Sequence, residues 1–185
     1  MVEHFYEKID GWFSFPMLYK EMVERFDNGC HFVEVGTWMG KSAAFMAVEI
    51  INSSKDIRFD CVDTWAGSSE HINPKSPYYT PELADPDWLF NQFESNLKPV
   101  LSSINPLRMT SLEASTLYAD QSLDFVFIDA SHEYQDVLDD IRAWMPKIKS
   151  GGILAGHDYP HHGVRKAVNE VFDSVEKQEH CWIVR

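Results

Sequence analysis

The most informative stretch of the chain is VEVGTWMGKSAAF, in which an apolar run ends in Glu34 and enters a turn bracketed by Gly36 and Gly40. A dinucleotide-binding turn needs another glycine near position 38, so that the backbone can approach a pyrophosphate, but this chain has Trp38 there. A phosphate-binding P-loop needs a glycine where Val35 stands. An acid before such a turn therefore suits a ligand with a cationic amine and no phosphate.

A second acid, Asp63, ends the next apolar run, RFDCVDTW, 27 residues after Gly36. A carboxylate at that place can accept both hydroxyls of a ribose. Each acid also has a purely structural explanation, because Glu34 could hydrogen-bond a neighbouring turn and Asp63 could be an ordinary strand-end or helix-capping residue. Together with the glycines, the two acids predict a site for one nucleoside-bearing ligand.

A third acid, Asp129, directly follows the apolar run of FVFIDASHEY, and His132 comes three residues later. A neutral imidazole, with an ordinary pKa of about 6.5, can accept a hydroxyl proton near neutral pH. His132 stands outside the apolar stripe of the helix that follows, so its ring need not serve the core. The alternative is a helix-start histidine that hydrogen-bonds a nearby carbonyl, beside an acid that only marks where a strand leaves the core.

The elements that must position these residues follow from hydrophobic periodicity, because short apolar runs alternate with helical patterns. Such alternation predicts an α/β fold with a doubly wound, mostly parallel sheet, in which ligands bind beyond the carboxyl ends of the strands. The tail HCWIVR predicts a last strand, pairing antiparallel at the sheet edge. The predicted strands lie near 31–36, 57–63, 104–109, 123–129 and 151–157, and the helices near 17–26, 40–52, 87–97, 133–145 and 162–173.

The chain is predicted to form a single domain over 1–185, with an N-terminal helical segment over 1–28. One irregular, proline-rich insertion over 65–86 interrupts the alternation, and it is either a lid over a ligand or a surface excursion. Its position after the carboxyl end of a strand favours the lid. Four of its side chains could stack on a ring or a sugar: Trp65, His71, Tyr78 and Tyr79.

Composition excludes several classes of protein. A net charge of -13, with scattered Lys and Arg, argues against nucleic acid as a partner. No apolar run is long enough for a membrane span, and the N-terminus lacks a secretory pattern. Three cysteines without a CxxC pair suit free thiols in a reducing compartment. We therefore expect a cytoplasmic protein without a membrane partner, and composition leaves its oligomeric state, including a homo-oligomer, open.

The run E-x-G-x-x-x-G-x-S-A, from Glu34 to Ala43, resembles the first motif of class I S-adenosylmethionine-dependent methyltransferases. The similarity covers about residues 30–185 and is greatest to the catechol O-methyltransferase-like and macrolide-sugar O-methyltransferase group. It implies a Rossmann-like sheet of seven strands that binds S-adenosylmethionine. The cofactor-binding residues that it implies are Glu34, Gly36, Thr37, Gly40 and Ser42 around the methionine part, Asp63 and Thr64 at the ribose, and Ser111 at adenine. Ser111 is also explained as a helix N-cap.

The resemblance further implies a divalent metal held by Asp129 and by the pair His157-Asp158 of GGILAGHDY, with His132 as the base. His157 departs from the family, where this place is commonly Asp-Asn or an acidic pair, and the family's base is commonly a lysine. Asp129 and Asp158 suit Mg²⁺, the favoured metal, whereas His157 suits Mn²⁺, Fe²⁺ or Zn²⁺ better. His161 and His162 are expected to be exposed loop residues outside the site.

The function that these expectations add up to is metal-assisted O-methylation of a small-molecule hydroxyl, in which a cation lowers the pKa of that hydroxyl and aims it at the methyl group. The acceptor is left open among sugars, phenols and similar molecules, as is N- in place of O-methylation. Two alternatives are a module that binds S-adenosylmethionine without turnover and an NAD-dependent oxidoreductase, against which Trp38 counts.

Overall fold

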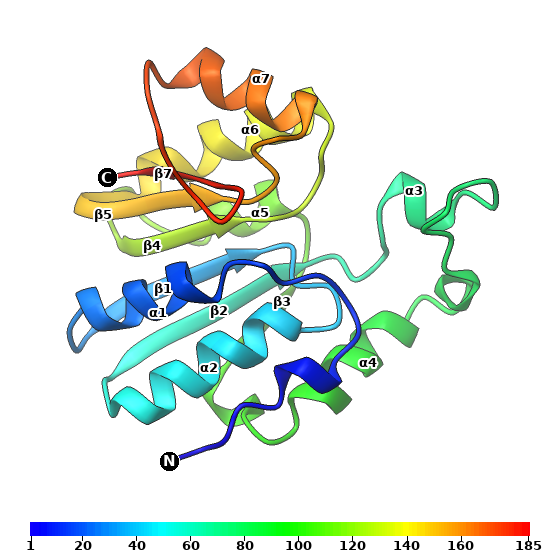
Figure 1. Ribbon diagram of the computed structural model, residues 1–185, viewed down its shortest axis with the longest axis horizontal. Helices are drawn as coiled ribbons and strands as arrows, with labels where there is room; N and C mark the ends of the chain where they lie inside the picture. Colours follow the sequence, from blue (N-terminus) through cyan, green and yellow to red (C-terminus); the bar gives the residue numbers. More distant parts are fainter.

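The computed structural model describes all 185 residues and is built on one seven-stranded sheet of order β3-β2-β1-β4-β5-β7-β6 (Figure 1). The first five strands in this order are parallel, while β7 is antiparallel to β5 and β6 is antiparallel to β7. The strands are β1 (Cys30–Val35), β2 (Ile57–Asp63), β3 (Asn105–Arg108), β4 (Leu123–Ile128), β5 (Ile148–Gly156), β6 (Glu176–Gln178) and β7 (Cys181–Val184). The predicted fold class, a doubly wound, mostly parallel sheet of seven strands with antiparallel pairing at its edge, is confirmed.

Helices cover both faces of the sheet because the strands alternate their apolar side chains. On β1, Phe32 belongs to the core formed with α1 and α2, whereas Val33 and Val35 belong to the core formed with α6 and α7. The α-helices are α1 (Pro16–Arg25), α2 (Lys41–Ser53), α3 (Ser69–Ile72), α4 (Trp88–Leu97), α5 (Ser111–Ser115), α6 (Tyr134–Trp144) and α7 (His162–Val171), and the short 3-10 helices are η1 (Tyr6–Lys8), η2 (Pro81–Ala84), η3 (Leu101–Ser103) and η4 (Met145–Lys147). None of the helices is long and apolar enough to cross a membrane.

The strand order reverses between β1 and β4, so the loops after these two strands open into one crevice at their carboxyl ends. The loop after β1 contains Gly36, and the loop after β4 begins at Asp129. The predicted insertion, which contains α3 and η2, forms an arm that projects from the body on this side of the molecule (Figure 1). The fold therefore brings the glycine turn, the acid of β4 and the insertion to the same end of the sheet.

The C-terminal end of the chain differs from the expectation. The tail strand β7 does pair antiparallel with β5, but the edge of the sheet is β6, a strand that the sequence did not predict. The two strands form a hairpin whose connecting residues, Glu179 and His180, both have positive φ, at 51° and 66°. A two-residue turn of this kind normally carries Asn-Gly or Asp-Gly, and without that signal the hairpin was not recognisable.

Candidate active site

The turn between β1 and α2 is built around two glycines in the left-handed region, Gly36 at φ 86° and Gly40 at φ 85°. Gly36 is also a place of close approach between backbones. A Cβ built on it would lie 2.1 Å from the carbonyl oxygen of Asp129 and 2.6 Å from its carbonyl carbon. Only glycine fits there, because both the conformation and the space exclude a side chain. The turn after β1 is thereby packed directly on the first residue after β4.

Asp63, at the end of β2, holds this turn through backbone hydrogen bonds. Its Oδ2 accepts from the amides of Thr37 and Trp38, each at 2.9 Å, and its Oδ1 accepts from the amide of Trp65 at 2.8 Å. These bonds use three of the roughly four acceptor positions of a carboxylate, so Asp63 organises the turn and keeps little capacity for the predicted ribose contact. Its neighbour Thr64 is exposed, and its hydroxyl accepts from the Ala66 amide at 3.3 Å.

Glu34 and Thr37 carry buried polar atoms that the protein leaves without partners. The Glu34 side chain is 1% exposed, and its Oε1 accepts a short hydrogen bond from the hydroxyl of Ser42. Its Oε2 has no hydrogen-bond partner, and neither has the hydroxyl of Thr37 or that of Tyr19, a buried residue of α1. Because buried polar groups are normally hydrogen-bonded, two orphaned groups beside a glycine turn fit the predicted ligand, whose amine and carboxylate would complete them. Burial raises the pKa of Glu34 to about 8.

Ser111, predicted to contact adenine, begins α5. Its hydroxyl accepts from the indole N–H of Trp144 at 2.9 Å, so the structure ties it to α6. The N-cap of α5 is Thr110, which forms a capping box with Glu113. Neither the predicted N-cap role nor a free hydroxyl is therefore observed at Ser111 in this structure.

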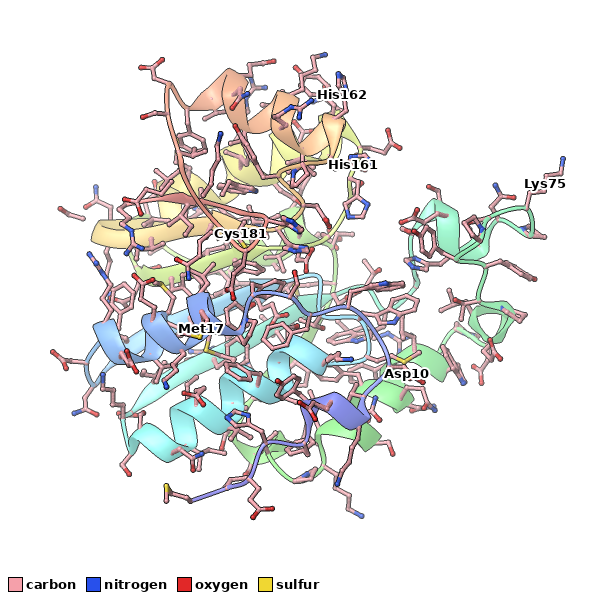
Figure 2. All side chains as sticks on the ribbon, in the orientation of Figure 1. Asp10, Met17, Lys75, His161, His162 and Cys181 are labelled. Atoms are coloured by element: carbon pink, nitrogen blue, oxygen red, sulfur yellow. The ribbon has the colours of Figure 1, made fainter.

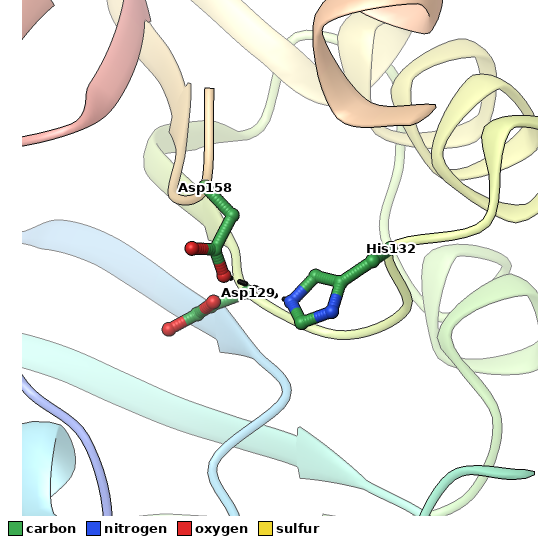
Figure 3. A group of neighbouring side chains, drawn as sticks. All are labelled: Asp129, His132 and Asp158. Atoms are coloured by element: carbon green, nitrogen blue, oxygen red, sulfur yellow. Dashed lines mark hydrogen bonds and ion pairs between the residues drawn. The ribbon is translucent and has the colours of Figure 1, made fainter. Parts of the chain in front are cut away.

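Three side chains converge where β4 and β5 end: Asp129 follows β4, Asp158 follows β5, and His132 lies in the loop before α6 (Figure 3). His132 Nε2 donates to Asp158 Oδ2 at 2.8 Å. One ligand atom from each of the three lies within 4.8 Å of the others, and all three residues are half-buried. Two carboxylate oxygens and an imidazole nitrogen make a donor set that fits a divalent cation, with Mg²⁺ using the oxygens and Mn²⁺, Fe²⁺ or Zn²⁺ also suiting the nitrogen.

His157, the predicted third metal ligand, lies beside this group. Its Nδ1 is 3.3 Å from Asp158 Oδ2 and 3.6 Å from Asp129 Oδ1. Its other nitrogen, Nε2, is hydrogen-bonded to the Ser14 hydroxyl at 3.0 Å, and its ring packs on Phe15 with centroids 4.9 Å apart. The N-terminal segment thus fixes the orientation of His157, which lies near both carboxylates, while His132 makes the shorter contact with Asp158 at 2.8 Å.

The carboxylates and histidines of this group shift each other's pKa values in opposite directions. Burial opposes the charge of Asp158, yet hydrogen bonds from His132 and His157 hold its pKa well below the usual range. The hydrogen bond to Asp158 raises the pKa of His132. Burial lowers the pKa of His157, but its contacts with Asp129 and Asp158 raise that pKa to about 10. Without a bound cation, the histidines therefore carry the charge that balances the two acids.

Two further segments reach this group: the predicted insertion and an N-terminal segment for which no such role was predicted. We call residues 10–15 the strap and residues 64–87 the lid. Glu70 of the lid places Oε1 3.8 Å from His132 Nδ1. Trp12 of the strap packs against His71 and Tyr78 of the lid, with centroids 6.4 and 5.8 Å away.

His71 of the lid also stacks on Trp38 of the glycine turn, with ring centroids 4.3 Å apart. The glycine turn, the lid and the strap therefore share one set of aromatic rings.

Two expectations about individual aromatic residues change. Trp65 is fully buried at 0% exposure, and its indole N–H donates to the Trp38 carbonyl at 2.9 Å, so it is a core residue rather than a surface for an acceptor. Tyr78 and Tyr79 are exposed, as a contact surface requires. His161 and His162 are exposed as predicted, but the ring of His161 lies 5.1 Å from that of His132, which puts His161 at the rim of the site.

Comparison with known proteins gives a family and a fold. The profile of the family described as "Methyltransferase domain" matches residues 33–159. The O-methyltransferase NovP superposes with a TM-score of 0.66 at 18% identity, covering 91% of this chain and 77% of that one. The calicheamicin methyltransferase CalS11 gives 0.62 at 12% identity, covering 92% and 76%. Fibrillarin from Aeropyrum pernix, solved with natively bound S-adenosyl-L-methionine, gives 0.55 at 10% identity, covering 90% and 72%.

A curated relative, the uncharacterized protein y4gI of Sinorhizobium fredii, is 28% identical over 128 residues, which are 68% of this chain and 13% of the relative. The chain thus spans only a small part of that relative's length. The family profile covers more than half of this chain, from the strand that carries Glu34 to the loop that carries Asp158. The chain belongs to the methyltransferase domain family and has the fold of class I S-adenosylmethionine-dependent methyltransferases.

Proposed function

We propose that this protein is an S-adenosylmethionine-dependent methyltransferase that methylates a hydroxyl of a small molecule with the help of a divalent cation. One observation carries the proposal. The backbone of Asp129 is packed on Gly36 of the glycine turn between β1 and α2, which we now call the cofactor turn. The carboxylate of Asp129 belongs to the group with Asp158 and His132. A methyl donor bound at the turn would therefore lie next to the residues that would activate an acceptor, as group transfer between two bound molecules requires.

The cofactor half of the proposal rests on the orphaned groups of the turn. Glu34 Oε2 would receive the amine of the ligand, and the Thr37 hydroxyl would meet its carboxylate. Gly36 and Gly40 let the backbone approach the ligand, and Asp63 keeps the turn in place while offering its remaining acceptor position to the ribose. When bound, S-adenosylmethionine supplies an electrophilic methyl group on a sulfonium.

In the acceptor half of the proposal, Asp129 and Asp158 would hold the cation, and His132 would accept the proton. A divalent cation there would lower the pKa of the acceptor hydroxyl and orient its oxygen. His132 takes the proton of that hydroxyl as its oxygen bonds to the methyl carbon and the carbon–sulfur bond breaks. The hydrogen bond to Asp158 orients the imidazole, and His157, fixed by Ser14, supports Asp158 from its other side.

An NAD-dependent oxidoreductase fits the same turn poorly. A pyrophosphate needs free backbone amides at the turn, and those of Thr37 and Trp38 already donate to Asp63. The Trp38 side chain, stacked on His71, also occupies the place where a dinucleotide fold has glycine. A binding module without turnover shares the cofactor half and differs only in the chemistry of the second half.

The test is methyl transfer from radiolabelled S-adenosylmethionine to a panel of phenols and sugars, with Mg²⁺, Mn²⁺ or excess EDTA. The proposal expects a product methylated on oxygen, made only with a divalent cation and restored when the cation is added back. Binding of S-adenosylhomocysteine without any product would favour the binding module. Full activity in EDTA would assign Asp129 and Asp158 to direct orientation of the acceptor, and product methylated on nitrogen would overturn the assignment to hydroxyls.

A further inference from the structure

We infer that the acceptor is a small hydroxyl-bearing molecule that also carries an ammonium group, as an amino sugar or a hydroxyaryl amine does, and that Glu70 of the lid recognises this charge. The inference rests on the proposed function, since it names the class of molecule that the proposed site would methylate. It is carried by the position of Glu70, by the aromatic rings around it and by the distribution of charge on the lid.

Glu70 lies one imidazole ring away from the group that would bind the acceptor hydroxyl. His132 joins the two, because its Nε2 is 2.8 Å from Asp158 and its Nδ1 is 3.8 Å from Glu70. The second distance is too long for a hydrogen bond, so the carboxylate keeps its acceptor capacity. The Glu70 side chain is 40% exposed, and therefore accessible to a ligand. A molecule with its hydroxyl at Asp129 and Asp158 would place a nearby ammonium within reach of Glu70.

The rings beside Glu70 also suit a cation. Trp12 of the strap is 64% exposed, although it packs edge-on against Tyr78 of the lid. Exposed faces of Trp and Tyr attract ammonium groups through the negative face of the ring, and they also stack on sugars and aryl rings. His71, between these rings and Trp38, has its pKa lowered by burial, so it stays neutral and does not repel a cation.

The net charge of the lid also favours a cationic acceptor. Residues 64–87 contain four acids, Glu70, Glu82, Asp85 and Asp87, against one base, Lys75. Lys75 stands at the tip of the arm and points away from the body (Figure 2). Asp87 is paired with Arg108 at 2.7 Å, whereas the one ion-pair contact of Glu70 is the longer one, at 3.8 Å, with His132. Phosphorylated or carboxylated acceptors would meet an acidic lid whose one lysine points away from the site, and like charges disfavour binding.

The experiment measures binding and turnover separately on matched acceptors. The protein is loaded with S-adenosylhomocysteine and a divalent cation, and ligand-observed NMR gives dissociation constants for two series of acceptors. One series is tyramine, 4-methylphenol and 4-hydroxyphenylacetate, and the other is glucosamine, glucose and glucuronate. The variants are Glu70→Gln and, as a matched control on the same lid, Glu82→Gln, which removes the same charge from an exposed residue of η2.

In at least one series we expect the cationic member to bind about tenfold more tightly than the anionic one, as one close pair of opposite charges allows. Glu70→Gln should remove most of that preference, whereas Glu82→Gln should keep it. Both variants should bind S-adenosylhomocysteine as tightly as the wild type. Equal or tighter binding of the anion, a preference that survives in Glu70→Gln, or no binding by either series would overturn the inference. Charge-selective binding without methyl transfer would contradict the proposed function alone, and transfer without charge selectivity would contradict this inference alone.

Discussion

The two halves of the candidate site are built in different ways. The cofactor half is buried and closed by hydrogen bonds between neighbouring elements, such as Ser42 to Glu34 and the Thr37 amide to Asp63. The acceptor half is half-exposed and assembled from remote segments, since Ser14 meets His157 across 143 residues of chain. Its lid reaches the group through the long contact from Glu70 to His132, and its strap reaches it through Ser14 and Phe15 at His157.

This difference indicates which half sets the identity of the cofactor and which sets that of the acceptor. A turn that needs glycine at Gly36 and a carboxylate at Asp63 tolerates few substitutions, so it specifies one ligand. The lid is an arm that projects from the body (Figure 1). Its side chains can change without disturbing the sheet, as is usual for loops that carry specificity. Variants in the two halves should therefore separate cofactor affinity from acceptor turnover.

The largest separation is expected at His132. His132→Ala should lower kcat by roughly 10²–10⁴-fold, the usual contribution of a general base, and leave the affinity for S-adenosylhomocysteine nearly intact. His162→Ala is the matched control, because His162 is exposed at the start of α7 and should retain wild-type kcat. Steady-state kinetics and calorimetry measure the two quantities. A His132→Ala protein with more than about a tenth of wild-type kcat would leave the cation alone to activate the acceptor.

A second prediction concerns the contact that joins the halves. Gly36→Ala combines positive φ with a Cβ 2.1 Å from the Asp129 carbonyl oxygen, whereas Gly151→Ala has a similar φ of 81° and nothing within 4 Å. Strain alone should cost Gly151→Ala about 1 kcal/mol of unfolding free energy, and the clash should make Gly36→Ala cost roughly 3 kcal/mol or more. Denaturant unfolding measures both. Equal losses would mean that the two loops are not packed together as described.

Most of the fold could be predicted from the sequence, because periodicity is a local property. The five parallel strands and the long helices lie within a few residues of their predicted ranges, and α6 shows why: Val137, Leu138, Ile141 and Trp144 recur at helical spacing and are all buried. The elements that were missed are short. The five residues of α5 and the three of β6 give no period to detect, and their ends depend on Thr110 and on the turn at Glu179 and His180.

The candidate site was predictable only where its residues follow strands. Glu34 and Asp63 are among the last two residues of their strands, and Asp129 and Asp158 follow theirs, so a parallel sheet had to bring them to one edge. No sequence spacing could show that the Asp63 carboxylate would accept hydrogen bonds from the amides of Thr37, Trp38 and Trp65. Nor could it show the contributions of Trp12, Ser14 and Glu70, which depend on where the strap and the lid cross the sheet.

A third prediction uses the unpartnered carboxyl of the cofactor half. The pKa of Glu34 is about 8 in the ligand-free protein, raised by burial from 4.5, so this carboxyl holds a proton at pH 7. The amine of the ligand favours the ionised form, so binding should release up to one proton and affinity should rise as the pH rises to about 8, by at most tenfold per pH unit. Calorimetry in buffers of different ionisation enthalpy counts the protons.

The raised pKa of Glu34 should also make the stability of the protein depend on pH. The folded protein holds this proton more tightly than the unfolded chain does, so the free energy of unfolding should fall as the pH rises from about 4.5 to about 8. Glu34→Gln should flatten both pH profiles between these limits. Binding of S-adenosylhomocysteine to the wild type without proton release at pH 7 would place the amine elsewhere.

The smallest effect is expected from the strap, and it bears on the acceptor half alone. Trp12→Ala removes an exposed ring that packs on His71 and Tyr78 but makes no hydrogen bond with the cofactor turn. Loss of a stacking surface worth about 1 kcal/mol should raise KM for the acceptor roughly fivefold, with kcat and the affinity for S-adenosylhomocysteine nearly unchanged. Met17→Ala, at an exposed position of α1, controls for loss of apolar surface and should leave KM unchanged. A Trp12→Ala protein that instead loses affinity for S-adenosylhomocysteine would show that the rings shared by Trp12, His71 and Trp38 couple the two halves, so that the acceptor side is not independent of the cofactor turn.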